Sequence, residues 1–151
     1  MDYEVDINTV IDIYTELADR VCDGESGFDS LNEYERTILV TQAVEGEVNN
    51  GGFIQFFDNS MGALAGETAA AFQRIGAKKT AAICRRALKV FPEGLPADWE
   101  ARRAYLDEHV TEAVEEKLEK CDDAFYMYED DLEALNVAYV REHMDQFDLL
   151  I

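Results

Sequence analysis

Apolar residues recur every three or four positions near the start of the chain. In residues 7–21 they are Ile7, Val10, Ile11, Tyr14, Leu17, Ala18 and Val21. This spacing places them on one face of an α-helix. Asp6 stands directly before the pattern and can cap its first turn. The pattern predicts an amphipathic helix over residues 7–21 that buries one face and exposes acids on the other.

A second helix is predicted over residues 31–47. The string SLNE, residues 30–33, has the form of a capping box in which Ser30 and Glu33 satisfy each other's backbone amides. The helix is expected to end at NNGG, because asparagine and glycine tolerate positive φ angles.

The rest of the chain shows further helical patterns separated by turn signals. Two helices are predicted over residues 66–75 and 78–91, and a third begins at Trp99 with Asp98 as its cap. The apolar face of residues 110–121 predicts a fourth, and residues 129–146 form a fifth. No alternating pattern of useful length indicates a strand. We therefore predict an all-α protein, with residues 1–151 forming a single compact domain of about seven to nine helices.

Composition supports a folded chain. Hydrophobic residues make up 48% of the sequence and aromatic residues 11%, well above the range of disordered chains. The acidic N-terminus and the lack of a long apolar run predict a cytoplasmic protein that does not enter a membrane. The three cysteines, Cys22, Cys84 and Cys121, are too few and too scattered for a disulfide framework.

Charge is the unusual property of this chain. The 33 acids and 13 bases give a net charge of -20. Residues 1–60 hold 14 acids and 2 bases, residues 61–105 hold 4 acids and 8 bases, and residues 106–151 hold 15 acids and 3 bases. Two acidic flanks therefore enclose a mildly basic middle.

The acids of the two flanks fall into stripes at helical spacing. The candidate partner-binding acids are Asp12, Glu16, Asp19 and Asp23 in the first flank, and Glu112, Glu115, Glu116, Glu119, Asp122, Asp123, Glu129, Asp130 and Asp131 in the second. Like charges four residues apart destabilise a helix, so helix stability does not explain the stripes. The first stripe alone is sparser than duplex DNA, which carries about one charge per 1.7 Å. Several stripes on one face, or in a dimer, would approach that density and offer an anionic target to a DNA-binding protein.

An acidic surface also suits a protein adapted to high salt. Such adaptation predicts acids spread over every helix, whereas here they are segregated into two flanks. Composition alone leaves the two interpretations open.

Other chemistry is weakly supported. His109 and His143 lack the spacing of a metal site, and the acid-rich residues 122–133 lack the glycine of an EF-hand loop, so no metal or cofactor is expected. The bases Lys78, Lys79, Arg85, Arg86 and Lys89 form a helical patch. In so negative a chain we expect them to pair with acids of the same molecule or of a partner subunit, and we expect no direct binding to nucleic acid.

The stretch VNNGGFIQFFDNSMG, residues 48–62, allows two interpretations. Phe53, Phe56 and Phe57 lie at i, i+3 and i+4, so they fit a short helix pinned into the core. Gln55 and Asn59 would then satisfy nearby backbone groups. The alternative is a small enzyme of unknown reaction whose site uses Glu45, Glu47, Asn49, Asn50 and Asn59.

The same stretch, with RIGAKKTAAICRRAL at residues 74–88 and FYMYEDDL at residues 125–132, resembles a bacterial DNA-mimic protein family. The matched signature is Asn50, Gly51, Gly52, Phe53, Gln55, Phe56, Phe57, Asn59 and Ser60, followed by Ile75, Gly76 and Ala77. The resemblance covers about residues 30–147.

This resemblance implies an all-helical, non-enzymatic protein that tends to form a homodimer. It implies that an acidic surface imitates duplex DNA and occupies a DNA-binding protein, in particular a helix-turn-helix transcription factor, which is kept from its DNA. Besides the small enzyme, a second alternative to the DNA mimic remains: an acidic immunity or interaction module that binds another basic protein.

Overall fold

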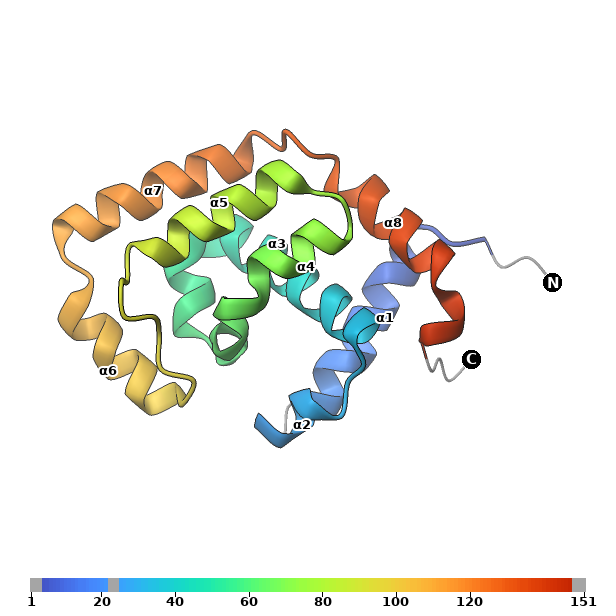
Figure 1. The fold of residues 1–151 in the computed structure, drawn as a ribbon, viewed down its shortest axis with the longest axis horizontal. Helices are drawn as coiled ribbons and strands as arrows, with labels where there is room; N and C mark the ends of the chain where they lie inside the picture. The colour runs from blue at the N-terminus through green and yellow to red at the C-terminus, as the bar shows by residue number, and fades with distance from the viewer. Residues whose placement is uncertain (1–3, 22–24, 148–151) are drawn as a thin grey trace.

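The computed structural model describes residues 4–21 and 25–147, which form eight α-helices, two 3-10 helices and no strand (Figure 1). In chain order the elements are α1 (Ile7–Val21), α2 (Glu25–Asp29), α3 (Glu33–Asp58), η1 (Ser60–Glu67), α4 (Thr68–Arg74), α5 (Lys78–Lys89), α6 (Trp99–His109), α7 (Glu112–Tyr126), α8 (Leu132–Glu142) and η2 (Met144–Gln146). The prediction of an all-α protein with seven to nine helices is confirmed. None of the helices described is long and apolar enough to span a membrane.

Helix α3 occupies the centre of the fold. It packs against α1, α4, α6, α7 and η1, while α5 packs against both α4 and α7. Figure 1 shows α5 and α7 running side by side along one edge, with α1 and α8 at the other end of the molecule. Among the described elements, α7 packs mainly against α3 and α5.

The three signature phenylalanines are part of the core, as predicted. Phe53, Phe56 and Phe57 are at most 2% exposed. Phe53 meets Phe125 of α7 edge to face, with ring centroids 6.0 Å apart, and Phe57 meets Phe91 in the same way at 5.8 Å. Burying one such ring contributes about 1.5–3 kcal/mol. The signature therefore joins α3 to α7 and to the segment after α5.

The capping box of α3 lies two residues later than predicted. Asn32 Oδ1 accepts the Glu35 amide at 2.8 Å, and Glu35 Oε1 accepts the Asn32 amide at 3.0 Å. Ser30 instead donates its hydroxyl to the Gly27 carbonyl, and Glu33 pairs with Arg74. The prediction was wrong because two overlapping strings, SLNE at residues 30–33 and NEYE at residues 32–35, both fit the motif. The second forms the box because Glu35 is buried and is held by an ion pair with Arg20 at 3.0 Å.

The predicted break in α3 lies at Gly52. The helix continues through Asn49 and Asn50, and Gly52 then adopts φ 84° and ψ 178°. This conformation frees the Phe53 amide, which donates to Asp122 Oδ1 of α7 at 2.8 Å. A Cβ atom at position 52 would lie 2.5 Å from Asp122 Oδ2. Glycine is required here both for the positive φ and for the close approach of the carboxylate.

The polar residues of the signature have different roles. Asn59 Oδ1 accepts the Met61 amide at 2.9 Å and caps η1, as predicted. Gln55 was expected to satisfy a backbone group, but its amide donates to Glu47 Oε2 at 2.6 Å. That prediction was wrong because Gln55 lies one turn beyond the kink, where the backbone already has its helical partners.

Of three further predicted helix boundaries, one is confirmed and two differ in the structure. Asp98 caps α6 by accepting the Ala101 amide at 2.9 Å, as expected. The helix predicted over 66–75 is divided into η1 and the shorter α4. The helix predicted over 129–146 is α8 alone, because Asp131 caps it at Ala134 and His143 leaves helical geometry at its end.

Arg102 is a fully buried cation that the sequence pattern did not identify. Its Nε donates to the Phe57 carbonyl at 2.7 Å, and its Nη2 donates to the Asn59 carbonyl at 2.7 Å. Its Nη1 donates to the Ala97 carbonyl at 2.8 Å. A Cβ atom at Gly62 would lie 2.8 Å from Arg102 Nε. Arg102 thus ties α6 to the last turn of α3.

The Asp122 contact generates a first prediction. Burial is the main reason that the pKa of Asp122 is raised, with Asp123 and Glu119 adding to it and the Phe53 amide opposing it. The pH-dependent part of its stabilising contribution is therefore full below the ordinary carboxyl pKa and is lost as pH rises through the raised value. The hydrogen bond from the Phe53 amide does not require the proton and persists with the carboxylate. Asp122→Ala leaves the Phe53 amide unpaired and should lower the free energy of unfolding by about 1–3 kcal/mol. Asp122→Asn keeps an acceptor oxygen and should lose less at neutral pH.

Urea denaturation of the two variants at neutral pH measures this difference. Equal losses of unfolding free energy in both variants would show that the side-chain acceptor oxygen of residue 122 does not support the kink.

Arg102 generates a second prediction. Arg102→Met removes the guanidinium donors from the Phe57, Asn59, Pro96 and Ala97 carbonyls and should lower the free energy of unfolding by about 3–5 kcal/mol. Arg103→Met is the matched control, since Arg103 is exposed on the same helix and pairs with Asp58 at 3.4 Å. Such a surface pair contributes about 0–1 kcal/mol. Similar thermal unfolding temperatures for the two variants would contradict the assignment.

Candidate protein-binding surface

Helix α7 carries an exposed stripe of carboxylates. Its buried face is made by Leu118, Cys121 and Phe125, which pack on α3 and α5. The helical repeat places five exposed acids together on the other side. These acids, called the α7 stripe below, are Glu112, Glu115, Glu116, Glu119 and Asp123. Thr111 caps the helix through the Val114 amide at 3.3 Å, so the stripe begins at a fixed position.

The spacing of the α7 stripe is close to that of phosphates on one DNA strand. From Glu112 to Asp123 the helix rises about 16 Å, because each residue adds about 1.5 Å. Five acids over that length give about one charge per 4 Å, against one per 3.4 Å along a strand of duplex DNA. The helix therefore presents an average charge density close to that of one DNA strand and less than half that of the duplex, which carries about one charge per 1.7 Å.

The α7 stripe has no ion-pair partner within the part of the chain that the structure describes. No ion pair there includes any of its five acids, although α7 also carries Lys117 and Lys120. Like charges at this spacing repel, by a few tenths of a kcal/mol per pair. The fold tolerates this repulsion, and the carboxylates stay available for an external cation.

Three acids of the second predicted group already have structural partners. Asp122 accepts the Phe53 amide, as described above. Asp130 Oδ2 accepts the Thr80 amide at 2.7 Å and the Thr80 hydroxyl at 2.9 Å, which caps α5. Asp131 caps α8. Glu129 is exposed. A partner would thus meet Asp122 and Asp130 as half-buried groups whose oxygens are partly engaged.

The first predicted group lies elsewhere on the molecule. Asp12 and Asp19 are exposed on α1, whereas Glu16 pairs with Arg20 at 2.9 Å. Asp23 lies outside the described residues. Figure 1 shows α1 and α7 in different halves of the molecule, with α3 and α4 between them. The structure therefore does not bring the two groups onto one continuous stripe.

Acids on α6 extend the surface near the start of α7. Asp107 and Glu108 are exposed at the end of α6. Asp107 lines a hollow of about 350 Å³, together with Asp58, Arg103 and Glu115. The periodicity of single helices missed this grouping because its acids come from three helices. The dense charge of residues 106–151 was the available signal.

Exposed apolar side chains follow the α7 stripe. Tyr126, Met127 and Tyr128 are 46%, 72% and 39% exposed. Tyr126 donates to the Val48 carbonyl at 2.8 Å, and Tyr128, at a φ of 47°, donates to Glu45 Oε2 at 3.0 Å. These bonds hold the turn against α3 and leave Met127 projecting. The sequence analysis did not identify this feature.

Four of the five residues of the enzyme alternative make structural hydrogen bonds, namely Glu45, Glu47, Asn49 and Asn59. Burial raises the pKa of Glu45, with the Tyr128 hydrogen bond opposing the shift and Glu133 adding to it. Asn49 donates to the Tyr128 hydroxyl at 2.6 Å, and Glu47 accepts from Gln55. Four hollows of the described surface have volumes of about 340–600 Å³, and none is lined by Glu45, Glu47, Asn49, Asn50 or Asn59. The geometry thus gives Glu45, Glu47, Asn49 and Asn59 a structural use.

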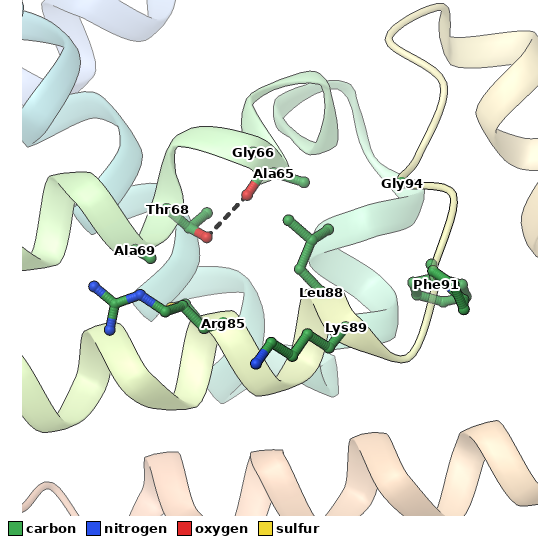
Figure 2. Close-up of a pocket in the computed structure, with 11 residues that line it drawn as sticks. Ala65, Gly66, Thr68, Ala69, Arg85, Leu88, Lys89, Phe91 and Gly94 are labelled. Carbon is green, nitrogen blue, oxygen red and sulfur yellow. Dashed lines mark hydrogen bonds between the residues drawn. The ribbon is translucent and has the colours of Figure 1, made fainter.

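A hollow of about 600 Å³ lies between α5 on one side and η1 with α4 on the other (Figure 2). Two of the five α5 bases, Arg85 and Lys89, line it. Those five bases were expected to pair with acids of the same molecule or of a partner subunit. The first alternative is wrong for the described residues, where no ion pair includes them. The reason is geometric, since α7 turns its lysine-bearing and acidic faces outward while α5 packs against its apolar face.

Among the described residues no group of three or more histidine, cysteine, aspartate or glutamate side chains is arranged to hold a metal ion.

Comparison with known proteins places the chain in a family. A family model described as DMP19-like protein matches residues 29–143. A search of the curated proteins and a search of the solved structures found no match.

Repulsion within the α7 stripe generates a third prediction. Replacing Glu116 and Glu119 with Gln should raise the free energy of unfolding by about 0.5 kcal/mol at low salt, because like-charge pairs along the helix are removed. The gain should shrink above about 0.5 M NaCl, where screening is strong. Glu93→Gln with Glu142→Gln makes the same change in net charge at exposed sites off α7 and should have little effect.

Chemical denaturation at several NaCl concentrations makes the measurement. A wild-type chain that folds only in molar salt would favour high-salt adaptation as the reason for the acids.

Proposed function

The chain belongs to the DMP19-like protein family, a DNA-mimic family, and we propose that it binds a DNA-binding protein and blocks that protein's access to DNA. The partner we propose is a helix-turn-helix transcription regulator. The proposed action is stoichiometric binding without catalysis. The main contact surface is the α7 stripe, extended by Asp107 and Glu108 of α6.

The α7 stripe, which has no ion-pair partner among the described residues, is the observation that supports this proposal most directly. A DNA-binding surface carries lysines and arginines placed to meet phosphates at regular intervals. Carboxylates at about 4 Å intervals on a fixed helix would meet several of those cations at once. Because α7 is held by Phe125, Leu118 and the Asp122 contact, binding would not require the stripe to be ordered first.

The separation of α1 from α7 shapes the proposal further. One copy presents a single dense stripe at one edge and a sparser group, Asp12 and Asp19, at the other end. We propose a homodimer in which two copies give two α7 stripes to a partner that is itself dimeric. Sedimentation velocity would test the dimer independently of the partner.

The fourth prediction concerns four acids of the stripe. Replacing Glu112, Glu115, Glu116 and Glu119 together with Lys should weaken binding to the partner by at least about 100-fold, because attraction becomes repulsion at the centre of the contact. The partner would be obtained by affinity capture from native lysate, purified, and titrated against the chain at several salt concentrations. Duplex DNA carrying the partner's site should compete, and affinity should fall steeply as salt rises.

The matched control makes the same change in net charge off α7. Its four sites are exposed: Glu4, Glu93, Glu142 and Asp145, each replaced with Lys. This control should bind within about tenfold of wild type, as expected for long-range screening alone. Circular dichroism confirms that both variants fold.

Equal binding by the two charge-reversed variants would exclude the α7 stripe as the contact. A partner that binds through the stripe but does not bind DNA would favour the interaction module for another basic protein.

A further inference from the structure

The hollow beside α5 has the character of a ligand site unrelated to the acidic surface. Its volume of about 600 Å³ lies within the usual range for small-molecule pockets. Its floor and walls are mainly apolar, and the apolar groups include Ala65, Ala69, Leu88 and Phe91. Figure 2 shows Leu88 pointing from α5 toward Ala65 and Gly66 of η1, with Phe91 and Gly94 at one end. An apolar chain would thus have contacts on several sides.

Both charged groups that line the hollow are cations. Arg85 and Lys89 stand one turn apart on α5, and no carboxylate is among the lining residues. The chain has 33 acids and 13 bases, so this local excess of positive charge departs from the rest of the surface. By contrast, the hollow beside α7 that contains Lys79 and Arg86 also contains Glu129.

The other polar side chains that line the hollow offer a ligand no charged donor, so Arg85 and Lys89 are the groups that can donate to an anionic ligand. The Thr68 hydroxyl donates to the Ala65 carbonyl at 2.9 Å, as drawn in Figure 2. Burial raises the pKa of Cys84 to about 12, so its thiol is neutral at physiological pH and adds to the apolar floor. Arg85 donates one Nη group to Gln73, which holds its side chain and leaves other N–H groups free for a second acceptor.

We propose that this hollow binds a single-chain amphiphilic anion, a medium-chain fatty acid. The carboxylate lies against Arg85 and Lys89, and the alkyl chain covers Leu88 and extends between η1 and Phe91. Charge complementarity selects the anionic head, and the apolar lining selects the chain. The site shares no residue with the α7 stripe, so either proposal can fail without the other.

Isothermal titration with sodium decanoate, below its micelle concentration, tests this proposal directly. Saturable binding at one site per chain is expected, with a dissociation constant on the order of 10–100 µM for a partly open site. Decanol retains the chain without the charge, and acetate retains the charge without the chain. Each should bind at least about tenfold more weakly than decanoate, because a charge-assisted contact or the apolar burial is lost.

Two variants assign the binding to this hollow. Arg85→Gln with Lys89→Gln removes both cations and should weaken decanoate binding by at least about tenfold. Lys78→Gln with Lys79→Gln is the matched control, since it makes the same change in charge on exposed sites of α5 outside the hollow and should leave binding unchanged. Gly66→Leu should also reduce binding by filling the space. A Cβ atom at Gly66 meets no atom within 4 Å, so this variant should fold normally.

Three results would overturn the proposal. The first is no saturable binding of decanoate up to millimolar concentration, and the second is equal binding by wild type and both hollow variants. The third is selective binding of an acidic amphipathic peptide in place of decanoate, which would make the hollow a peptide-docking groove. Circular dichroism of every variant separates a lost site from a lost fold.

Discussion

The contact between the Phe53 amide and the Asp122 carboxylate fixes the relation between the two parts of this fold that matter most. Gly52 breaks α3 with a positive φ and leaves the Phe53 amide without a helical acceptor. Asp122 reaches across from α7 and accepts that amide at 2.8 Å. A buried amide without a partner is costly, so α7 cannot slide or rotate freely along α3. Phe125, three residues farther along α7, adds its edge-to-face contact with Phe53.

This contact connects the family signature to the surface that we propose for binding. The NNGGF run holds no acid, and its phenylalanine, Phe53, is buried. Its effect on the surface is indirect: by fixing Asp122 it also fixes which side of α7 faces outward, and the α7 stripe lies on that side. The signature and the acids are thus separate requirements, one for the orientation of the helix and the other for its charge.

Sequence reasoning predicted the parts of the fold that depend on local pattern. The helical periodicities, the buried phenylalanines, the break at NNGG and the Asp98 cap depend on residues within one or two turns of one another. It failed where a distant group decides. Two overlapping capping strings could not be ranked without Arg20 beside Glu35, and Arg102 gave no periodic signal because its partners are backbone carbonyls from other segments. The same holds for the candidate site. The sequence predicted the spacing of the acids along α7, but the separation of α7 from α1 and the nearby acids of α6 depend on how the helices pack.

The acids of the second flank also divide into two physical classes that their spacing could not distinguish. Asp122, Asp130 and Asp131 accept backbone amides at a kink or a helix start, where a carboxylate stabilises the free N–H groups. The acids of the α7 stripe accept no such bond among the described residues, and they repel one another. Acids of the first class are explained by the fold alone. Those of the second class weaken the fold slightly, so stability does not explain them, whereas a cationic partner of the kind that we propose would relieve their repulsion by binding.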